Sequence, residues 1–131
     1  MSLSEMVESS EHFSSEELMC KCGCGVSRMD GVFMERLEAV RRQFGKPMKI
    51  TSAYRCPLHP IEKSKSHNGN KPTGMHPNSR AVDVAVERGD ALKLIQIALE
   101  QGMRGIGVQQ KSTGRFIHMD DRDGEPTIWS Y

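Results

Sequence analysis

The sequence has little excess charge of either sign and few aromatic residues. Its 18 Lys and Arg against 17 Asp and Glu leave a formal net charge of +1, and Phe, Trp and Tyr make up 5% of the 131 residues. Without a basic excess, we expect no surface that binds nucleic-acid phosphates. The sequence also lacks an apolar run of about 18 residues, so we expect no insertion into a membrane.

We also expect no signal peptide, because the first residues, MSLSEMVESSEHFSSEE, are acidic and polar. We therefore expect synthesis in a cytoplasm, with any later action outside it reached by another route. An apolar content of 37% and a charged content of 27% predict a single soluble globular domain with its own core. Residues 1–12 are predicted to be disordered and residues 13–131 to form this domain, which we expect to be a monomer.

The four cysteines lack the spacing of common structural zinc sites. Cys20, Cys22 and Cys24 alternate along CKCGCG, and Cys56 follows much later, whereas those zinc sites use two-residue gaps and a second pair downstream. A metal site in this segment and a disulfide to Cys56 both stay open. Synthesis in a cytoplasm disfavours the disulfide, so thiols without a defined partner are the favoured interpretation.

Two helices and one helical turn are predicted from apolar spacing and capping residues. Ser14 and Glu17 form a capping-box pattern that predicts a short helical turn. Residues 29–45 and 89–102 have helical periodicity, and Gly45 is a natural C-terminal cap for the first of these helices. Its apolar face is assigned to Val32, Phe33, Leu37, Val40 and Phe44.

Strands are predicted over residues 48–54, 81–86, 104–110 and 115–120, with a hairpin at 111–114 and an edge strand near 126–131. Alternation places Asp83 on the face opposite Val82, Val84 and Val86, and it places His118 and Asp120 on one face with Phe116. Residues 56–80 have no periodicity, and such a long irregular segment inside a compact domain is usually functional.

Asp83 stands among apolar residues, where a carboxylate is costly unless a cation or several donors compensate it. His76 precedes Asp83 by seven residues, and His118 lies in another strand with a similar apolar pattern. Two imidazoles and one carboxylate are a common ligand set for catalytic zinc. These residues together therefore predict a metal site, whereas each taken alone would be interpreted as a satisfied histidine or a turn aspartate.

Three segments, SAYRCPLH, GMHPNSRAVDV and GIGVQQKSTGRFIHMD, resemble the pattern of the peptidase M15 family. This family contains zinc D-Ala-D-Ala carboxypeptidases and related peptidoglycan peptidases of bacteria and phages. The resemblance is to its small branch, with the core S-x-Y-R, S-x-H-x-x-G-x-A-x-D and F-x-H-x-D, and covers residues 13–129. It implies an α+β fold of the Hedgehog/DD-peptidase type, in which a small, mostly antiparallel sheet has helices on one face and a zinc cleft on the other. It also implies that His76, Asp83 and His118 bind Zn²⁺.

The resemblance implies further roles around the metal. Arg55 falls where the family's arginine faces the substrate carbonyl, and a fixed guanidinium there would stabilise developing negative charge. Ser52 and Tyr54 flank Arg55 and are expected either to line the substrate cleft or merely to alternate along the strand. Some branches carry an acidic base three residues before the last histidine, where this chain has Arg115. Asp120 is the predicted substitute base, and a carboxylate that supports a metal ligand or orients Arg55 is the alternative role.

The loop before Asp83 also departs from the family pattern. Ser79 stands at the family's glycine, which requires a negative φ if serine is to fit without strain, and Gly74 replaces a serine. His59 and His67 lie in the same loop, where they either contact substrate or are solvated, and the second role is favoured.

The sequence therefore predicts a zinc peptidase that hydrolyses an amide in a peptidoglycan stem peptide or cross-bridge. It would act on the bacterial cell wall, as a phage lysis or wall-entry enzyme. One alternative is a non-catalytic, zinc-stabilised module that binds wall peptides or another protein, which Arg115 at the usual base position favours. A metal nuclease is a second alternative, suggested by the number of histidines, but the neutral charge argues against it.

Overall fold

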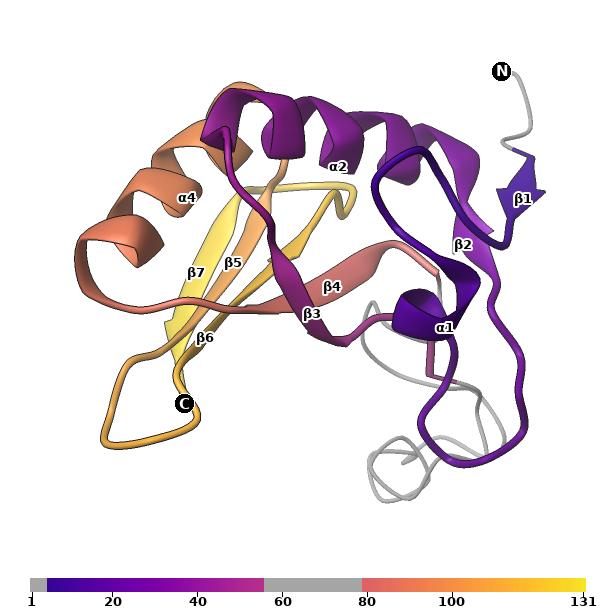
Figure 1. Ribbon diagram of the computed structural model, residues 1–131. Helices are drawn as coiled ribbons and strands as arrows, with labels where there is room; N and C mark the ends of the chain where they lie inside the picture. The colour runs from indigo at the N-terminus through magenta and orange to yellow at the C-terminus, as the bar shows by residue number, and fades with distance from the viewer. Residues whose placement is uncertain (1–4, 56–78) are drawn as a thin grey trace.

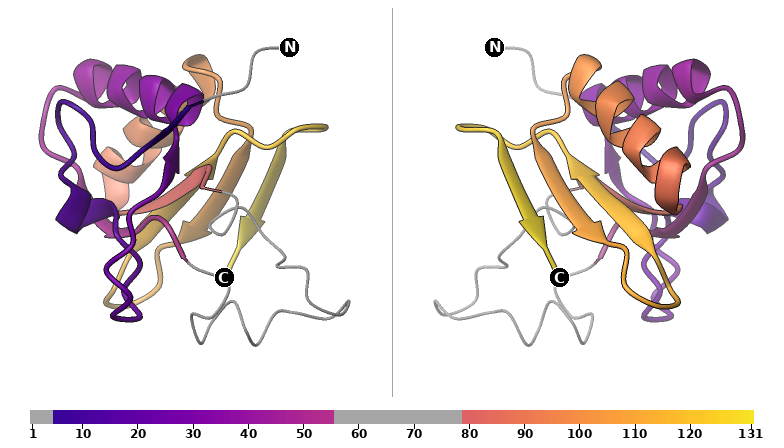
Figure 2. Two further views of the ribbon diagram at one scale, coloured as in Figure 1. Left: turned by 90° about the vertical axis from the view of Figure 1, so that its right-hand side faces the viewer. Right: turned by 90° about the vertical axis from the view of Figure 1, so that its left-hand side faces the viewer.

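A computed structural model describes residues 5–55 and 79–131 and confirms the α+β class. Two helices, α2 (Gly31–Phe44) and α4 (Arg88–Glu100), lie together on one face of a five-stranded sheet (Figures 1 and 2). The sheet has the order β3-β4-β6-β5-β7, and all of its pairs are antiparallel except β5 with β7. Its strands are β3 (Lys49–Ser52), β4 (Ala81–Ala85), β5 (Gly105–Gln109), β6 (Phe116–Asp120) and β7 (Thr127–Ser130). No helix in the described ranges is both long and apolar enough to cross a membrane.

Helix α2 begins and ends at residues that satisfy its terminal backbone groups. Asp30 is the N-cap, and its Oδ2 accepts a hydrogen bond from the Phe33 amide at 2.8 Å. Gly45 ends the helix with a φ of 76°, a left-handed conformation that favours glycine. The predicted apolar face is confirmed except at Val32, which is 41% exposed. Val32 lies about 100° around the helix from Phe33, outside the stripe that faces the sheet.

The predicted alternation of β4 and β6 is confirmed. The helix-covered face of the sheet carries apolar side chains that are at most 2% exposed, namely Val82, Val84, Ile106, Ile117 and Met119. Asp83, His118 and Asp120 therefore lie on the opposite face, as expected from the period of two residues along a strand. The polar residues and the helices occupy different faces of the same sheet.

Strand β3 is shorter than the predicted strand over residues 48–54. Its register against β4 shifts between Ile50 and Ser52, and the strand ends there. The Tyr54 amide then donates to the carbonyl of Leu18, at the end of helix α1 (Ser15–Leu18), at 3.1 Å. Because of this contact Tyr54 leaves the sheet and packs in the hydrophobic core, with 9% exposure.

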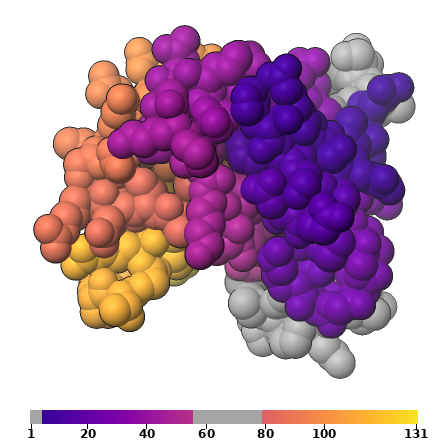
Figure 3. Space-filling model, in the orientation of Figure 1, coloured from indigo at the N-terminus to yellow at the C-terminus, as the bar shows by residue number. Residues whose placement is uncertain are grey.

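Residues 5–12 are ordered, although the sequence predicts disorder over residues 1–12. Strand β1 (Met6–Val7) pairs antiparallel with β2 (Met29–Asp30), and the atoms of the N-terminal part of the chain lie against α2 in Figure 3. Residues 1–4 lie outside the described ranges. The order comes from tertiary contacts with distant residues, which a local polar composition does not reveal.

One of these contacts is made by Glu38, a 7% exposed carboxylate on α2. It accepts hydrogen bonds from the Ser10 hydroxyl at 2.5 Å and the His12 amide at 2.8 Å, and His12 Nδ1 lies 2.5 Å from its other oxygen. Burial raises the pKa of Glu38, but these hydrogen bonds and the charge of His12 outweigh burial and lower it below its usual value.

This contact predicts a pH-dependent effect of Glu38→Gln on stability. Because the folded-state pKa is lowered, the contribution of Glu38 is fully present above its unfolded-state pKa and is lost as pH falls through the folded-state pKa. We expect the variant to lose about 1–3 kcal/mol of unfolding free energy near neutral pH, and less in acid. Urea titrations of both proteins across this pH range measure the difference. Glu35→Gln, at an exposed position of the same helix, is the control, and a pH-independent loss in Glu38→Gln would contradict the prediction.

Candidate metal centre

The site is built on one row of residues that crosses all five strands of the sheet. The strand registers pair Ser52 with Asp83, Asp83 with His118, His118 with Gly107, and Gly107 with Trp129. Paired residues on one face bring their Cβ atoms to about 5 Å from one another. Residues from β3 to β7 are therefore neighbours in space although they are far apart in sequence.

His118 lies between two carboxylates and is 4% exposed. Its Nδ1 is 3.0 Å from Asp83 Oδ1, and its Nε2 is 2.6 Å from Asp120 Oδ2. Burial lowers the pKa of His118, but the hydrogen bonds and charges of Asp120 and Asp83 outweigh burial and raise it. Both carboxylates thus compensate the imidazole, and the imidazole in turn explains how Asp83, at 5% exposure, tolerates its apolar strand.

Both oxygens of Asp120 are occupied, and the residue has no exposed surface. Arg122 donates from Nε to Oδ1 at 2.9 Å and from Nη2 to Oδ2 at 2.8 Å, and its backbone amide donates to Oδ1 at 3.1 Å. Burial raises the pKa of Asp120, but Arg122 and His118 outweigh it and hold this pKa far below its usual value. These contacts favour the orienting role that the sequence left open for Asp120, because its carboxylate is turned to the far nitrogen of His118.

Arg55 reaches the site from the segment after β3. Its Nε donates to Ser52 Oγ at 3.1 Å, and its Nη2 lies 3.5 Å from Asp83 Oδ2. The side chain of Arg55 is 12% exposed, so the guanidinium is largely buried beside Asp83. Ser52 supports Arg55, whereas the neighbouring Tyr54 packs in the core.

Two glycines of β5 make room for the site. A Cβ at Gly107 would come within 2.7 Å of Trp129 Nε1, and a Cβ at Gly105 would overlap the Asp120 carboxylate. Because Gly107 has no side chain, Trp129 lies against His118, with ring centroids 5.0 Å apart. The guanidinium carbon of Arg122 lies over the Trp129 ring, 4.8 Å from its centroid. No role for Arg122 or Trp129 was predicted from the sequence, although the G-x-G pattern in β5 and the inclusion of Trp129 in the family resemblance were signals for them.

Tyr131 lies at the margin of the same site. Its ring centroid is 5.1 Å from that of Phe116, which shares a strand with His118. Burial raises the pKa of Tyr131, a hydrogen bond with Trp129 lowers it, and the charges of Asp83 and Asp120 raise it further. The charges of the site therefore act on the phenol of Tyr131. The sequence did not predict this arrangement.

Several other predictions concern residues beside the site. Ser79 has a φ of 66°, so the condition for an unstrained serine is not met, and serine here adopts the left-handed conformation that glycine takes without strain. Asp121 points away from His118, as expected, and accepts from Arg80 Nε at 2.7 Å. Arg115 Nη1 donates to Glu87 at 3.2 Å, so its charge is directed to the segment that precedes α4.

Five predicted residues cannot be compared with the structure. His76, the third expected metal ligand, lies outside the described residues together with Cys56, His59, His67 and Gly74. For them the sequence predictions stand as predictions.

The described part of the donor set fits zinc. Asp83 supplies carboxylate oxygens and His118 an imidazole nitrogen, which are ligand types of catalytic zinc sites, and the two side chains approach one another directly. The other nitrogen of His118 is held by a carboxylate, the usual partner that orients a zinc-bound histidine. Nothing in these contacts opposes a metal next to Asp83 and His118.

Comparison with known proteins agrees with this chemistry. Among curated proteins the comparison finds no match. A family model described as Peptidase M15 matches residues 11–120, which include helices α1, α2 and α4 and every strand from β2 to β6. M15 peptidases are hydrolases of the metallopeptidase type and typically depend on zinc. The match covers most of the 131 residues, and the chain therefore belongs to the peptidase M15 family.

Proposed function

We propose that this protein is a zinc-dependent peptidase that hydrolyses an amide bond in peptidoglycan stem peptides or cross-bridges, as a carboxypeptidase or an endopeptidase. The observation that carries the proposal is the Asp83–His118 pair with Arg55 beside it, in a chain of the M15 family. The neutral charge of the chain supports a peptide substrate over a nucleic acid. Action on the bacterial cell wall, in phage lysis or wall entry, follows from the resemblance to such enzymes.

The metal would be held by Asp83 and His118, with His76 as the third protein ligand. When bound, zinc supplies a Lewis acid that polarises a carbonyl and lowers the pKa of a coordinated water. The protein contributes a sheet face on which the ligand side chains are already oriented by buried partners. Such preorganisation keeps the ligands close to the geometry that the reaction needs.

Arg55 is proposed to bind the carbonyl oxygen of the scissile amide or a nearby carboxylate of the substrate. Ser52 holds Nε of Arg55 and Asp83 lies near Nη2, so the guanidinium is fixed before substrate arrives. A fixed cation stabilises negative charge on the carbonyl oxygen during attack without having to reorganise. Contact of Ser52 and Tyr54 with substrate stays a prediction of the resemblance.

Asp120 is proposed to be a positioning residue for His118 instead of the proton acceptor. Its burial, its three hydrogen bonds with Arg122 and the lowered pKa all favour a permanently ionised carboxylate that accepts from Nε2 of His118. This arrangement leaves Nδ1 of His118, on the Asp83 side, as the nitrogen available to a metal.

Asp120→Asn separates the two roles. A positioning role predicts zinc affinity reduced about 10–100-fold, with activity restored by added zinc, because loss of an outer hydrogen-bonding partner weakens the ligand. A role as general base predicts loss of activity at full zinc occupancy. Zinc titration against a fluorescent chelator, combined with assays at increasing free zinc, distinguishes these outcomes. Asp123→Asn, at an exposed turn position, is the matched control.

The proposed reaction is tested by incubating zinc-loaded protein with purified peptidoglycan. New amines and released fragments, identified by mass spectrometry, would name the bond that is cut. A chelated sample should release no fragments, and re-addition of zinc should restore them. Absence of fragments while the zinc that His118→Ala removes is still bound would exclude this substrate and favour the non-catalytic wall-binding module.

A further inference from the structure

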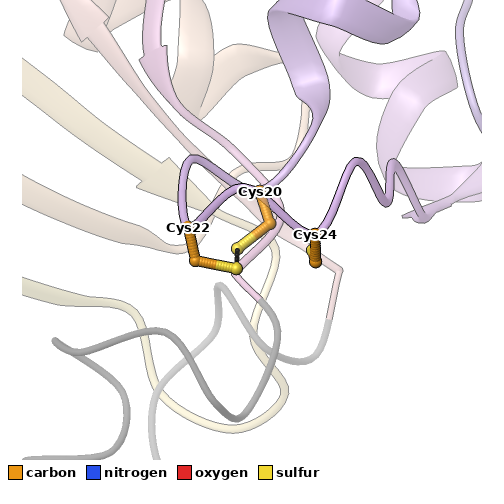
Figure 4. Close-up of side chains that lie close together, drawn as sticks. All are labelled: Cys20, Cys22 and Cys24. Carbon is orange, nitrogen blue, oxygen red and sulfur yellow. Dashed lines mark hydrogen bonds between the residues drawn. The ribbon is translucent and has the colours of Figure 1, made fainter.

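A second cluster of metal-ligating side chains lies in the turn after α1. Cys20, Cys22 and Cys24 come from a single turn, shown in Figure 4, and their Sγ atoms all lie within 4.8 Å of one another. Cys20 is 1% exposed, whereas Cys22 and Cys24 are exposed. The cluster shares no residue with the Asp83–His118 centre.

Backbone geometry brings the three sulfurs together. The Cys20 amide donates to the Val26 carbonyl at 2.8 Å and closes the turn. Gly23 and Gly25 have φ values of 97° and 72°, in the left-handed region that glycine adopts without strain. These two glycines let the chain reverse direction within the turn. The side chains of the three alternate cysteines therefore lie close together.

The distances between the sulfur atoms fit a shared metal ion better than a disulfide bond within the turn. Cys20 Sγ and Cys22 Sγ are 3.4 Å apart. Tetrahedral zinc with bonds of about 2.3 Å to sulfur places two thiolates about 3.8 Å apart. This separation is close to the 3.4 Å between Cys20 Sγ and Cys22 Sγ, and it is below the 4.8 Å within which all three sulfurs lie. A disulfide would instead require the sulfurs to approach to about 2.05 Å. Thiolates are also the preferred ligands of soft and borderline metals.

We propose that Cys20, Cys22 and Cys24 form a second, structural metal site that binds zinc through three thiolates. The site is anchored to the peptidase fold, because Leu18, two residues before Cys20, accepts the backbone hydrogen bond of Tyr54. Tyr54 directly precedes Arg55. A metal in the turn therefore stabilises the segment that carries Arg55, and this proposal is independent of the reaction proposed for the Asp83–His118 centre.

Cobalt substitution tests the site, because only thiolate ligands give Co²⁺ an intense near-ultraviolet charge-transfer band. The full chain is reduced, stripped of metal and titrated with Co²⁺, and the absorption and the bound metal are measured. We expect the wild type to show the band and to bind about two ions per chain. Cys22→Ser combined with Cys24→Ser should abolish the band, whereas His118→Ala should keep it. Both serine substitutions are at exposed positions, and circular dichroism checks that the fold is retained.

Alkylation provides a second measurement on the unmodified sequence. Zinc should protect Cys22 and Cys24 from iodoacetamide, as read by peptide mass spectrometry, and a chelator should remove the protection. The proposal is overturned by a wild-type protein without the charge-transfer band, by a band that survives both serine substitutions, or by a disulfide between this cluster and Cys56 in the protein as isolated. None of these readouts depends on peptidase activity.

Discussion

His118→Ala is expected to remove the catalytic zinc and with it all peptidase activity. His118 is the central residue of the cross-strand row and the only described imidazole beside Asp83. We expect zinc affinity to fall by more than the roughly 100-fold that loss of an outer partner can cause, because a direct ligand is lost. Equilibrium dialysis measures the zinc bound, and the peptidoglycan assay measures activity.

The variant needs a stability control, because Asp83 and Asp120 would remain buried without the imidazole. Urea unfolding shows at which temperature the variant is folded in the absence of denaturant. Zinc binding is then measured at that temperature. His67→Ala is the matched histidine control, since the sequence predicts that His67 is solvated. Zinc binding that is unchanged in His118→Ala, or lost equally in His67→Ala, would contradict the assignment.

Arg55→Ala is expected to lower kcat by about 10²–10³-fold, the usual effect of removing one preorganised donor to a developing oxyanion. Zinc should stay bound, because Asp83 keeps its contact with His118 when Arg55 is lost. The rate is measured under saturating zinc, so that a loss of metal cannot account for the change. An Arg55→Lys variant should recover only part of the rate, since lysine keeps the charge but not the planar fork that spans Ser52 and Asp83.

Arg42→Ala, at an exposed position on α2, provides the arginine control and should leave kcat unchanged. A kcat that is unchanged in Arg55→Ala would show that Arg55 only supports Asp83. An increase in KM alone would indicate that Arg55 binds the substrate equally in the ground state and the transition state, instead of stabilising charge during the reaction.

The sequence was sufficient to predict the fold class and the face of the sheet that carries the site. Alternation along β4 and β6 separates Asp83 and His118 from the valines, isoleucine and methionine of the core, and this follows from a period of two residues alone. The C-terminal end of α2 followed similarly from local chemistry, since Gly45 terminates the helix by its own backbone preference.

Local patterns did not reveal partners that come from distant parts of the chain. Residues 5–12 look disordered by composition, yet Glu38 on α2 holds them through Ser10 and His12. Tyr54 follows the alternation of β3 in sequence, but its amide pairs with Leu18 and turns it into the core. Such contacts depend on how elements pack and not on the spacing within either element.

The sequence by itself determined which side chains share the metal face, because strand periodicity is a local property of the backbone. Only the tertiary structure decided what each of them contacts. Strand register places Trp129 and Gly107 in the row of His118, and the turn after β6 brings Arg122 back onto Asp120. The roles of Asp120, Arg122 and Trp129 thus depend on pairing between strands, whose register is set by the packed core as a whole.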